Sequence, residues 1–131
     1  MFIDASALTA LLTDEHEARE LLARLQQART RLTSPLAVWE TTIAVSRLLD
    51  LSIGDTLEAL ESYLALMEIE LAAVPPATTR IALDAFDRYG KGRHPARLNF
   101  GDCFAYACAR HFGEPLMFKG EDFPHTDIEA A

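Results

Sequence analysis

Short apolar runs alternate with longer segments of helical periodicity along this chain of 131 residues. Residues 1–3, 31–33 and 115–118 have the length and composition of buried strands. Residues 68–71 alternate polar and apolar side chains, as a strand at the edge of a sheet does. Because strands that are separated by helices lie parallel in one sheet, the pattern predicts an α/β fold with a mainly parallel central sheet.

Six segments between the apolar runs carry the periodicity or the capping signals of helices. The expected helices cover residues 5–12, 18–28, 35–49, 52–65, 77–90 and 102–109, and a last short strand is expected over 126–128. Residues 14–17 have the form of a capping box, and Ser34 before Pro35 is a typical helix start. The helix from residue 102 is apolar almost all round, so we expect it to be the central helix, packed on several sides.

Length and composition predict one domain, residues 1–131, in the cytoplasm. No apolar stretch approaches the roughly 20 residues of a membrane span, and an acid at the fourth residue argues against a secretory signal. Cys103 and Cys108 point to different sides of one helix, which favours buried thiols over a disulfide or a zinc site. The four histidines lack the spacing of a soft-metal site, so any metal is expected to be hard and bound by oxygen.

The charge of the chain is unevenly distributed. Twenty acidic and twelve basic residues give a net charge of −8, which by itself argues against a nucleic acid partner. Residues 88–97, however, contain Arg88, Lys91, Arg93 and Arg97 and no acid. This segment is either a solvated loop that aids solubility or an arm in which Lys91, Arg93 and Arg97 bind the phosphate groups of a nucleic acid backbone without reading its sequence.

Four acidic residues stand where a buried sheet and its helices would favour other side chains. Asp4 follows the first strand, Glu40 lies within the apolar stripe of its helix, Asp102 starts the central helix, and Asp122 follows the last apolar run. Each also has a purely structural explanation: an N-cap for Asp4 and Asp102, a salt bridge with Arg47 for Glu40, and a turn for Asp122.

The predicted fold brings these acids together. Residues just past the carboxyl ends of parallel strands meet at one rim of the sheet, where such folds bind their ligands. Four carboxylates in a small volume repel one another unless a divalent cation neutralises them. Carboxylate oxygens favour Mg²⁺ or Mn²⁺. The pattern therefore predicts metal-assisted hydrolysis of phosphodiester bonds, for which no protein nucleophile is needed.

Several short motifs in register resemble those of the PIN-domain family, and most closely the VapC toxins of bacterial and archaeal VapBC toxin–antitoxin modules. They are residues 1–8 (MFIDASAL), Glu40, residues 98–103 (LNFGDC) and residues 118–123 (FKGEDF), with the basic segment 88–97 before the third. Each motif alone is weak, but together they cover essentially the whole chain in the right order.

The resemblance implies a three-layer α/β/α sandwich, a homodimer, and a Mg²⁺-dependent endoribonuclease that is the toxin of a type II system, with Mn²⁺ as a substitute ion. It places the family's acids on Asp4, Glu40, Asp102 and Asp122. Asp4 and Asp102 would bind the metal, Glu40 and Asp122 would complete the site directly or through water, and Asp127 is a candidate outer member. The implied partners are an RNA substrate and a VapB-type antitoxin that covers the acidic pocket.

Other roles and other classes stay open at this point. Ser6 and Thr126 are candidates for hydrogen bonds to the acids or to the nearby backbone, and Trp39 is a candidate for the core, a dimer contact or a partner groove. The alternatives are a PIN-like module that only binds a partner, and a Mg²⁺-binding receiver domain. A receiver needs an adjacent acidic pair after the first strand, and a dehalogenase-type phosphatase needs an acid at position 6; Ala5 and Ser6 stand at these positions.

Overall fold

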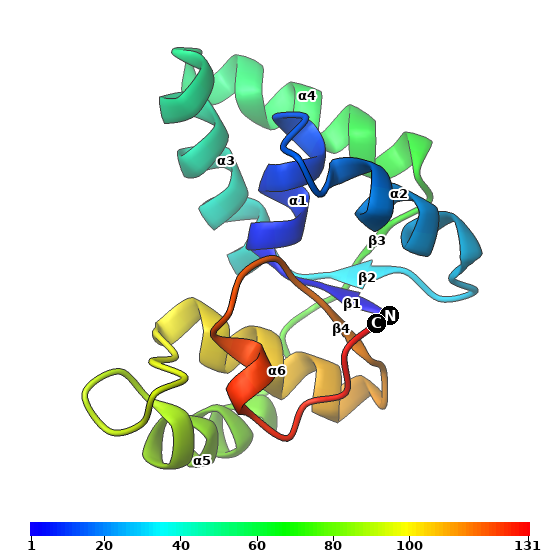
Figure 1. The fold of residues 1–131 in the computed structure, drawn as a ribbon. Coiled ribbons are helices and arrows are strands. Elements are labelled where there is room, and N and C mark those ends of the chain that lie inside the picture. The colour runs from blue at the N-terminus through cyan, green and yellow to red at the C-terminus, as the bar shows by residue number, and fades with distance from the viewer.

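A parallel four-stranded sheet separates two groups of helices in the computed structural model, which describes residues 1–131 (Figure 1). The elements are β1 (Phe2–Ile3), α1 (Ala5–Leu12), α2 (Ala18–Gln27), β2 (Leu32–Thr33), α3 (Pro35–Leu49), α4 (Ile53–Leu66), β3 (Glu70–Leu71), α5 (Thr78–Tyr89), α6 (Phe100–Phe112), β4 (Leu116–Met117) and the 3-10 helix η1 (Phe123–His125). The strand order is β3-β2-β1-β4. Helices α1 to α4 lie on one side of the sheet and α5 and α6 on the other, so the predicted three-layer α/β/α architecture is confirmed.

Strands β1 and β4 each divide their two side chains between two hydrophobic cores. Phe2 and Leu116 belong to the core under α5 and α6, whereas Ile3 and Met117 belong to the core under α1, α2 and α4. This follows from the two-residue period of a strand. The two residues of β3 are exposed, in agreement with the edge strand expected there.

Serine side chains cap the first turns of α3 and α4. The Ser34 hydroxyl accepts a bond from the N–H of Ala37 at 3.2 Å and begins α3, as predicted. Ser52 does the same for α4 through the N–H of Asp55, at 3.0 Å. Serine is favoured at such positions because its oxygen satisfies an N–H that has no partner within the helix.

Helix α6 is the central helix, as the sequence predicts. It contacts α5, α3, β1 and β4, and both of its cysteines are buried free thiols whose pKa burial raises to about 11. It begins at Phe100, two residues earlier than expected, because Asn99 is its N-cap. No helix of the structure has both the length and the hydropathy needed to cross a membrane.

Two local predictions are wrong. Residues 126–128 do not form a strand: the Thr126 hydroxyl donates to the carbonyl of Phe123, at 2.7 Å, and accepts from the N–H of Ile128. These local hydrogen bonds take the place of hydrogen bonds to a neighbouring strand. The C-terminal segment pairs with β4 only through Ala130, which lies opposite Leu116. Residues 14–17 form no capping box, because Glu17 holds the N-cap position of α2 without a side-chain bond.

Candidate active site

Asp4 directly follows β1 and is almost fully buried, with 4% of its surface exposed. Its Oδ2 accepts hydrogen bonds from the backbone N–H of Ser6, at 2.9 Å, and from the Ser6 hydroxyl. The first bond caps α1, so the structural explanation considered for this residue is correct. Burial nevertheless raises the pKa of the Asp4 carboxyl above its usual range, in spite of the bonds from Ser6.

Ser6 connects the ends of two neighbouring strands. Its hydroxyl donates to Asp4, which follows β1, and accepts from the N–H of Lys119, which lies just beyond β4, at 3.0 Å. The expectation that Ser6 bonds an acid is confirmed, whereas Thr126 bonds only the nearby backbone. Ser6 therefore fixes the orientation of the Asp4 carboxylate relative to the segment that leads to Asp122.

Asp102 lies in the first turn of α6. Its carboxylate accepts from the N–H of Asn99 and its own N–H donates to the Asn99 side chain, both at 2.9 Å, so the two residues form a capping box. The N-cap is thus Asn99 and not Asp102. Burial raises the pKa of Asp102 to about 6, and the charges of Asp4 and Asp122 add to this effect while the Asn99 bond opposes it.

Glu40 reaches the same region from α3. Its carboxylate lies against Gly101, at a place where a Cβ on residue 101 would overlap it. No salt bridge to Arg47 forms. Burial raises the pKa of Glu40 to about 7, and the charges of Asp4 and Asp102 contribute. Gly101 is not among the predicted site residues, although a glycine at the start of an apolar helix and next to Asp102 is a signal of close approach.

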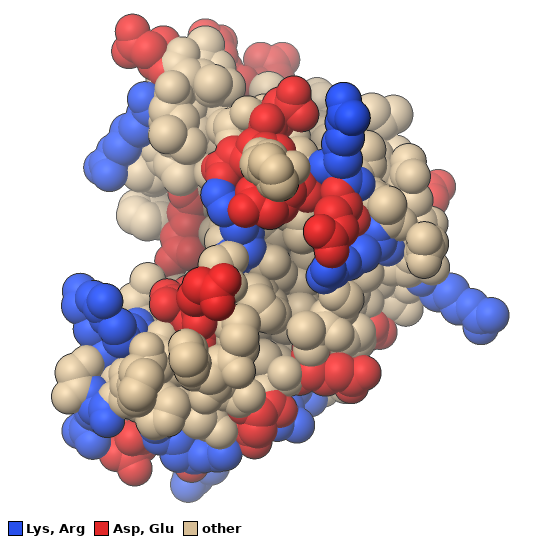
Figure 2. Space-filling model, viewed as in Figure 1, with Lys and Arg blue, Asp and Glu red and all other residues tan.

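Asp122 is exposed and precedes η1 without a side-chain hydrogen bond. Its charge acts on Asp102, so the structure brings all four predicted acids into one region at the carboxyl ends of β1 and β4. None of the four takes part in an ion pair. Figure 2 shows acidic side chains inside a hollow between α3 and the loop that follows α5, with basic side chains on the rim formed by that loop.

The donor set of this region fits a hard divalent cation. All of its acidic side chains offer carboxylate oxygens, which Mg²⁺ and Mn²⁺ prefer. Burial raises the pKa of Asp4, Glu40 and Asp102, and no lysine or arginine forms an ion pair with any of them. No three histidine, cysteine or acidic side chains are grouped so that they could hold a metal ion together, so an ion here would be bound by one or two carboxylates and would keep several waters, as Mg²⁺ usually does.

The basic segment forms an ordered loop from Gly90 to Leu98, closed by a bond from the Lys91 N–H to the Leu98 carbonyl, at 2.9 Å. Lys91 and Arg97 are exposed and form no ion pair, whereas Arg93 pairs with Asp87 at 2.9 Å. The three cations predicted to bind RNA are therefore not equivalent.

Arg88, the first cation of the basic segment, points away from the loop. It pairs with Asp127 at 3.1 Å, and Arg110 does so at 3.0 Å. The Tyr106 hydroxyl also donates to Asp127, at 2.7 Å. This bond and the two guanidinium groups hold the pKa of Asp127 far below its usual range. Asp127 is thus already neutralised, and the expectation that it is an outer member of the acid site is wrong.

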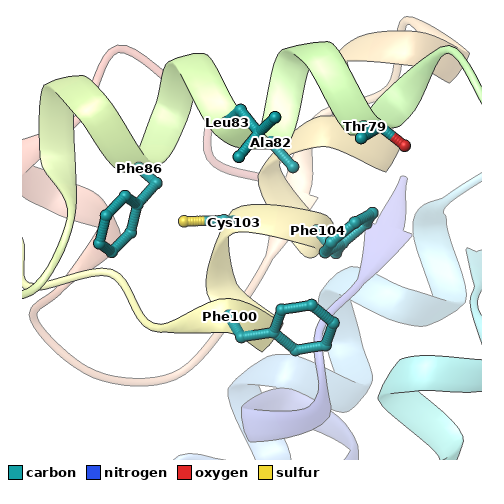
Figure 3. A pocket seen from close by; sticks show the side chains of 7 residues that line it. All are labelled: Thr79, Ala82, Leu83, Phe86, Phe100, Cys103 and Phe104. Atoms are coloured by element: carbon teal, nitrogen blue, oxygen red, sulfur yellow. The ribbon is translucent and has the colours of Figure 1, made fainter.

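Two apolar surfaces adjoin the acids. Trp39, next to Glu40 on α3, is 66% exposed and so does not belong to the core. On the other side of Asp102, a groove of about 410 Å³ lies between α5 and α6 (Figure 3). Its lining consists of Thr79, Ala82, Leu83, Phe86, Phe100, Cys103 and Phe104. Phe100 and Cys103 flank Gly101 and Asp102 in sequence, so the groove and the acid site share the first turn of α6.

Comparisons with known proteins agree with this geometry. Ribonuclease VapC30 of Mycobacterium tuberculosis is 41% identical over 128 residues, which span 98% of this chain and 95% of the relative. Ribonuclease VapC of Mycolicibacterium smegmatis is 42% identical over 130 residues, or 99% and 98% of the two chains. The crystal structure of Mycobacterium tuberculosis VapC20, a sarcin-ricin loop cleaving toxin, superposes with a TM-score of 0.76 at 18% identity and covers 99% of this chain and 97% of that one. A family model described as PIN domain matches residues 1–129, and the chain belongs to the PIN-domain family.

Proposed function

We propose that this chain is one PIN domain that acts as a Mg²⁺-dependent endoribonuclease, the toxin of a type II toxin–antitoxin pair. The observation that carries the proposal is the group of Asp4, Glu40, Asp102 and Asp122, which lie in one region and have no lysine or arginine as partner. Relatives that are named ribonucleases and align over nearly the whole chain support the same reaction.

The buried acids supply the ligands for the ion. Asp4 and Asp102 would bind Mg²⁺ or Mn²⁺ directly, and Glu40 and Asp122 would bind it directly or through water. A bound divalent ion activates a water for attack on phosphorus and stabilises the charge that develops on the leaving oxygen. Glu40, whose pKa burial raises to about 7, would act as the general base that takes up a proton from a water beside the ion.

Lys91 and Arg97 hold the RNA backbone beside this site. Both are exposed on the ordered loop 90–98, and neither is neutralised by an acid. Arg93 contributes less, because Asp87 pairs with it and its guanidinium lies 5.5 Å from the ring centre of Phe86. Contacts of this kind bind phosphates without selecting a sequence.

The protein partners are a VapB-type antitoxin and a second copy of this chain. Exposed apolar surfaces support such association, since a monomer rarely leaves large apolar patches in water. They are the groove between α5 and α6 and the exposed side chains of α3 and α4, which include Trp39, Leu48 and Ile53. The protein would act in the cytoplasm, where its RNA substrate lies.

The decisive experiment measures cleavage of single-stranded RNA with Mg²⁺, with Mn²⁺ and after EDTA. We expect cleavage with either ion, none with EDTA, and none by Asp4→Ala or Asp102→Ala at unchanged circular dichroism. Asp55→Ala, which removes an exposed acid from the first turn of α4, should cleave as the wild type does. Wild-type rates in the double variant Asp4→Ala, Asp102→Ala would overturn the proposal. A pure protein that binds RNA without cutting it would favour the partner-binding module instead.

A further inference from the structure

The segment that carries Asp122 is held at Lys119 by two separate contacts. The backbone N–H of Lys119 donates to the Ser6 hydroxyl at 3.0 Å. The Nζ of the same residue pairs with Glu15, in the turn between α1 and α2, and lies 3.8 Å from Glu17. One residue thus joins the end of β4 to two parts of the N-terminal segment.

The ion pair between Lys119 and Glu15 can restrain the loop that leads to Asp122. Lys119 and Glu15 are 104 residues apart in sequence, and their side chains are only 33% and 28% exposed. Such partly buried pairs are screened by salt less than surface pairs are. Beyond Lys119 the chain turns at Gly120, with a φ of +105°, and reaches Asp122, whose own side chain makes no hydrogen bond. The position of Asp122 therefore depends on how residues 118–121 are held.

We propose that Lys119 is a positioning residue of the acid site: paired with Glu15 and bonded to Ser6, it fixes the loop between β4 and η1 so that Asp122 faces Asp102. The inference rests on the proposed function, because it assigns a role in metal binding to a contact outside the four acids. The effect of the Asp122 charge on Asp102 agrees with this placement.

A direct contact between Lys119 and the RNA is the competing role for a cation near a nuclease site. The structure disfavours it because Nζ is already neutralised by Glu15, with Glu17 nearby. The two roles make opposite predictions for Glu15→Gln. Loss of the Glu15 charge frees Lys119. If Lys119 contacts phosphate, RNA binding should become stronger; if Lys119 positions the loop, the loop is released and metal binding should become weaker.

The test measures Mn²⁺ affinity by calorimetry without RNA, together with kcat and KM for cleavage at saturating Mn²⁺. We expect Lys119→Met and Glu15→Gln each to weaken Mn²⁺ binding about tenfold, the lower range for partners that orient metal ligands. The double variant should lose no more than either single one, because both break the same contact. Lys119→Arg, which keeps the pair, should bind Mn²⁺ as the wild type does. The KM for RNA should stay unchanged in all of them.

Arg80→Met is the control, since it removes an exposed cation from α5, on the other side of the sheet, and leaves residues 118–121 untouched. Unchanged Mn²⁺ affinity in Lys119→Met, or a raised KM for RNA with unchanged metal affinity, would overturn the positioning role and leave the nuclease proposal standing. A wild-type protein that binds no Mn²⁺ would overturn both. Melting curves of each variant exclude unfolding as the cause of a lost affinity.

Discussion

The carboxylate of Glu40 lies directly against the backbone of Gly101, where the Cβ of any other residue would overlap it. Glu40 belongs to α3 and Gly101 to the first turn of α6, next to Asp102. The contact brings the glutamate within the influence of the aspartate charge and explains the small residue at this position. Gly101 is thus a part of the site because, having no side chain, it leaves room for the Glu40 carboxylate.

Gly101→Ala is expected to reduce RNA cleavage about 100-fold, because a shift of about 1 Å at a reacting group can have this effect. The added methyl group overlaps the Glu40 carboxylate and displaces it. The measurement is kcat/KM on single-stranded RNA with saturating Mg²⁺.

Gly54→Ala is the control for Gly101→Ala, since both glycines occupy the second position of a helix and nothing lies within 4 Å of a Cβ at residue 54. It should keep full activity and gain about 0.4–1 kcal/mol in stability, since alanine restricts the unfolded chain. Full activity of Gly101→Ala would show that Glu40 is not required where the structure places it.

The metal-free protein should lose stability as the pH rises from about 5 to about 8. The pKa of Glu40 is raised to about 7 and that of Asp102 to about 6, so the folded state binds protons more tightly than the unfolded state. Their stabilising contribution is present at low pH and is lost as the pH rises through these values. The measurement is the Tm against pH in EDTA.

Glu40→Gln with Asp102→Asn should flatten this pH dependence, whereas Glu58→Gln, at an exposed site on α4, should leave it unchanged. Added Mg²⁺ should raise the Tm at pH 8 and have little effect at pH 5, where protons compete for the same oxygens. A Tm of the wild type that is constant over this range would contradict the burial of these acids.

The ends of the elements that carry Asp4 and Glu40 follow from local sequence. An apolar run before Asp4, and Ser34 with Pro35 at the start of α3, place both residues correctly, because caps and periodicity act over a few residues. That the acids meet follows from the parallel order of the strands. The acids themselves pointed to metal-assisted phosphodiester hydrolysis, and the family resemblance then added the RNA substrate and the toxin role.

The contacts between distant segments could not be predicted from the sequence. The Glu40–Gly101 contact depends on how α3 crosses α6, and the Lys119–Glu15 pair depends on where the turn after α1 lies. Residues 14–17 form no capping box because Asp14 adopts a positive φ of 50° and Glu17, not Asp14, holds the N-cap position of α2. Local bonds of Thr126 likewise removed the strand expected at 126–128.

Lys91→Ala with Arg97→Ala should weaken RNA binding and reduce its salt dependence. Each phosphate contact contributes about 0.7 to the slope of log K against log salt concentration for a single strand, so the pair should lower the slope by about 1.4. Binding is measured in an Asp102→Asn background to prevent cleavage. Arg93→Ala should have a smaller effect because Asp87 already pairs with this residue.

The matched control for the basic loop is Arg29→Ala, an exposed arginine between α2 and β2 at the opposite end of the sheet. It should leave both the affinity and the slope unchanged. If the double variant and this control behaved alike, the loop would serve solubility alone, and the RNA path would lie elsewhere on the protein.

Asp127→Asn should lower the stability of the protein and leave RNA cleavage unchanged. The Tyr106 hydroxyl, Arg88 and Arg110 keep the pKa of Asp127 far below its usual range, so its contribution is present above the unfolded-state pKa of about 4 and is lost as the pH falls. Because the group is 45% exposed, we expect a loss of roughly 1 kcal/mol at pH 7. Asp84→Asn, which removes only the 3.5 Å contact to Arg88, should cost less. Lost cleavage at unchanged stability would instead show that Asp127 belongs to the acid site. A residue that only joins α5, α6 and the C-terminal segment can affect the reaction only by destabilising the fold.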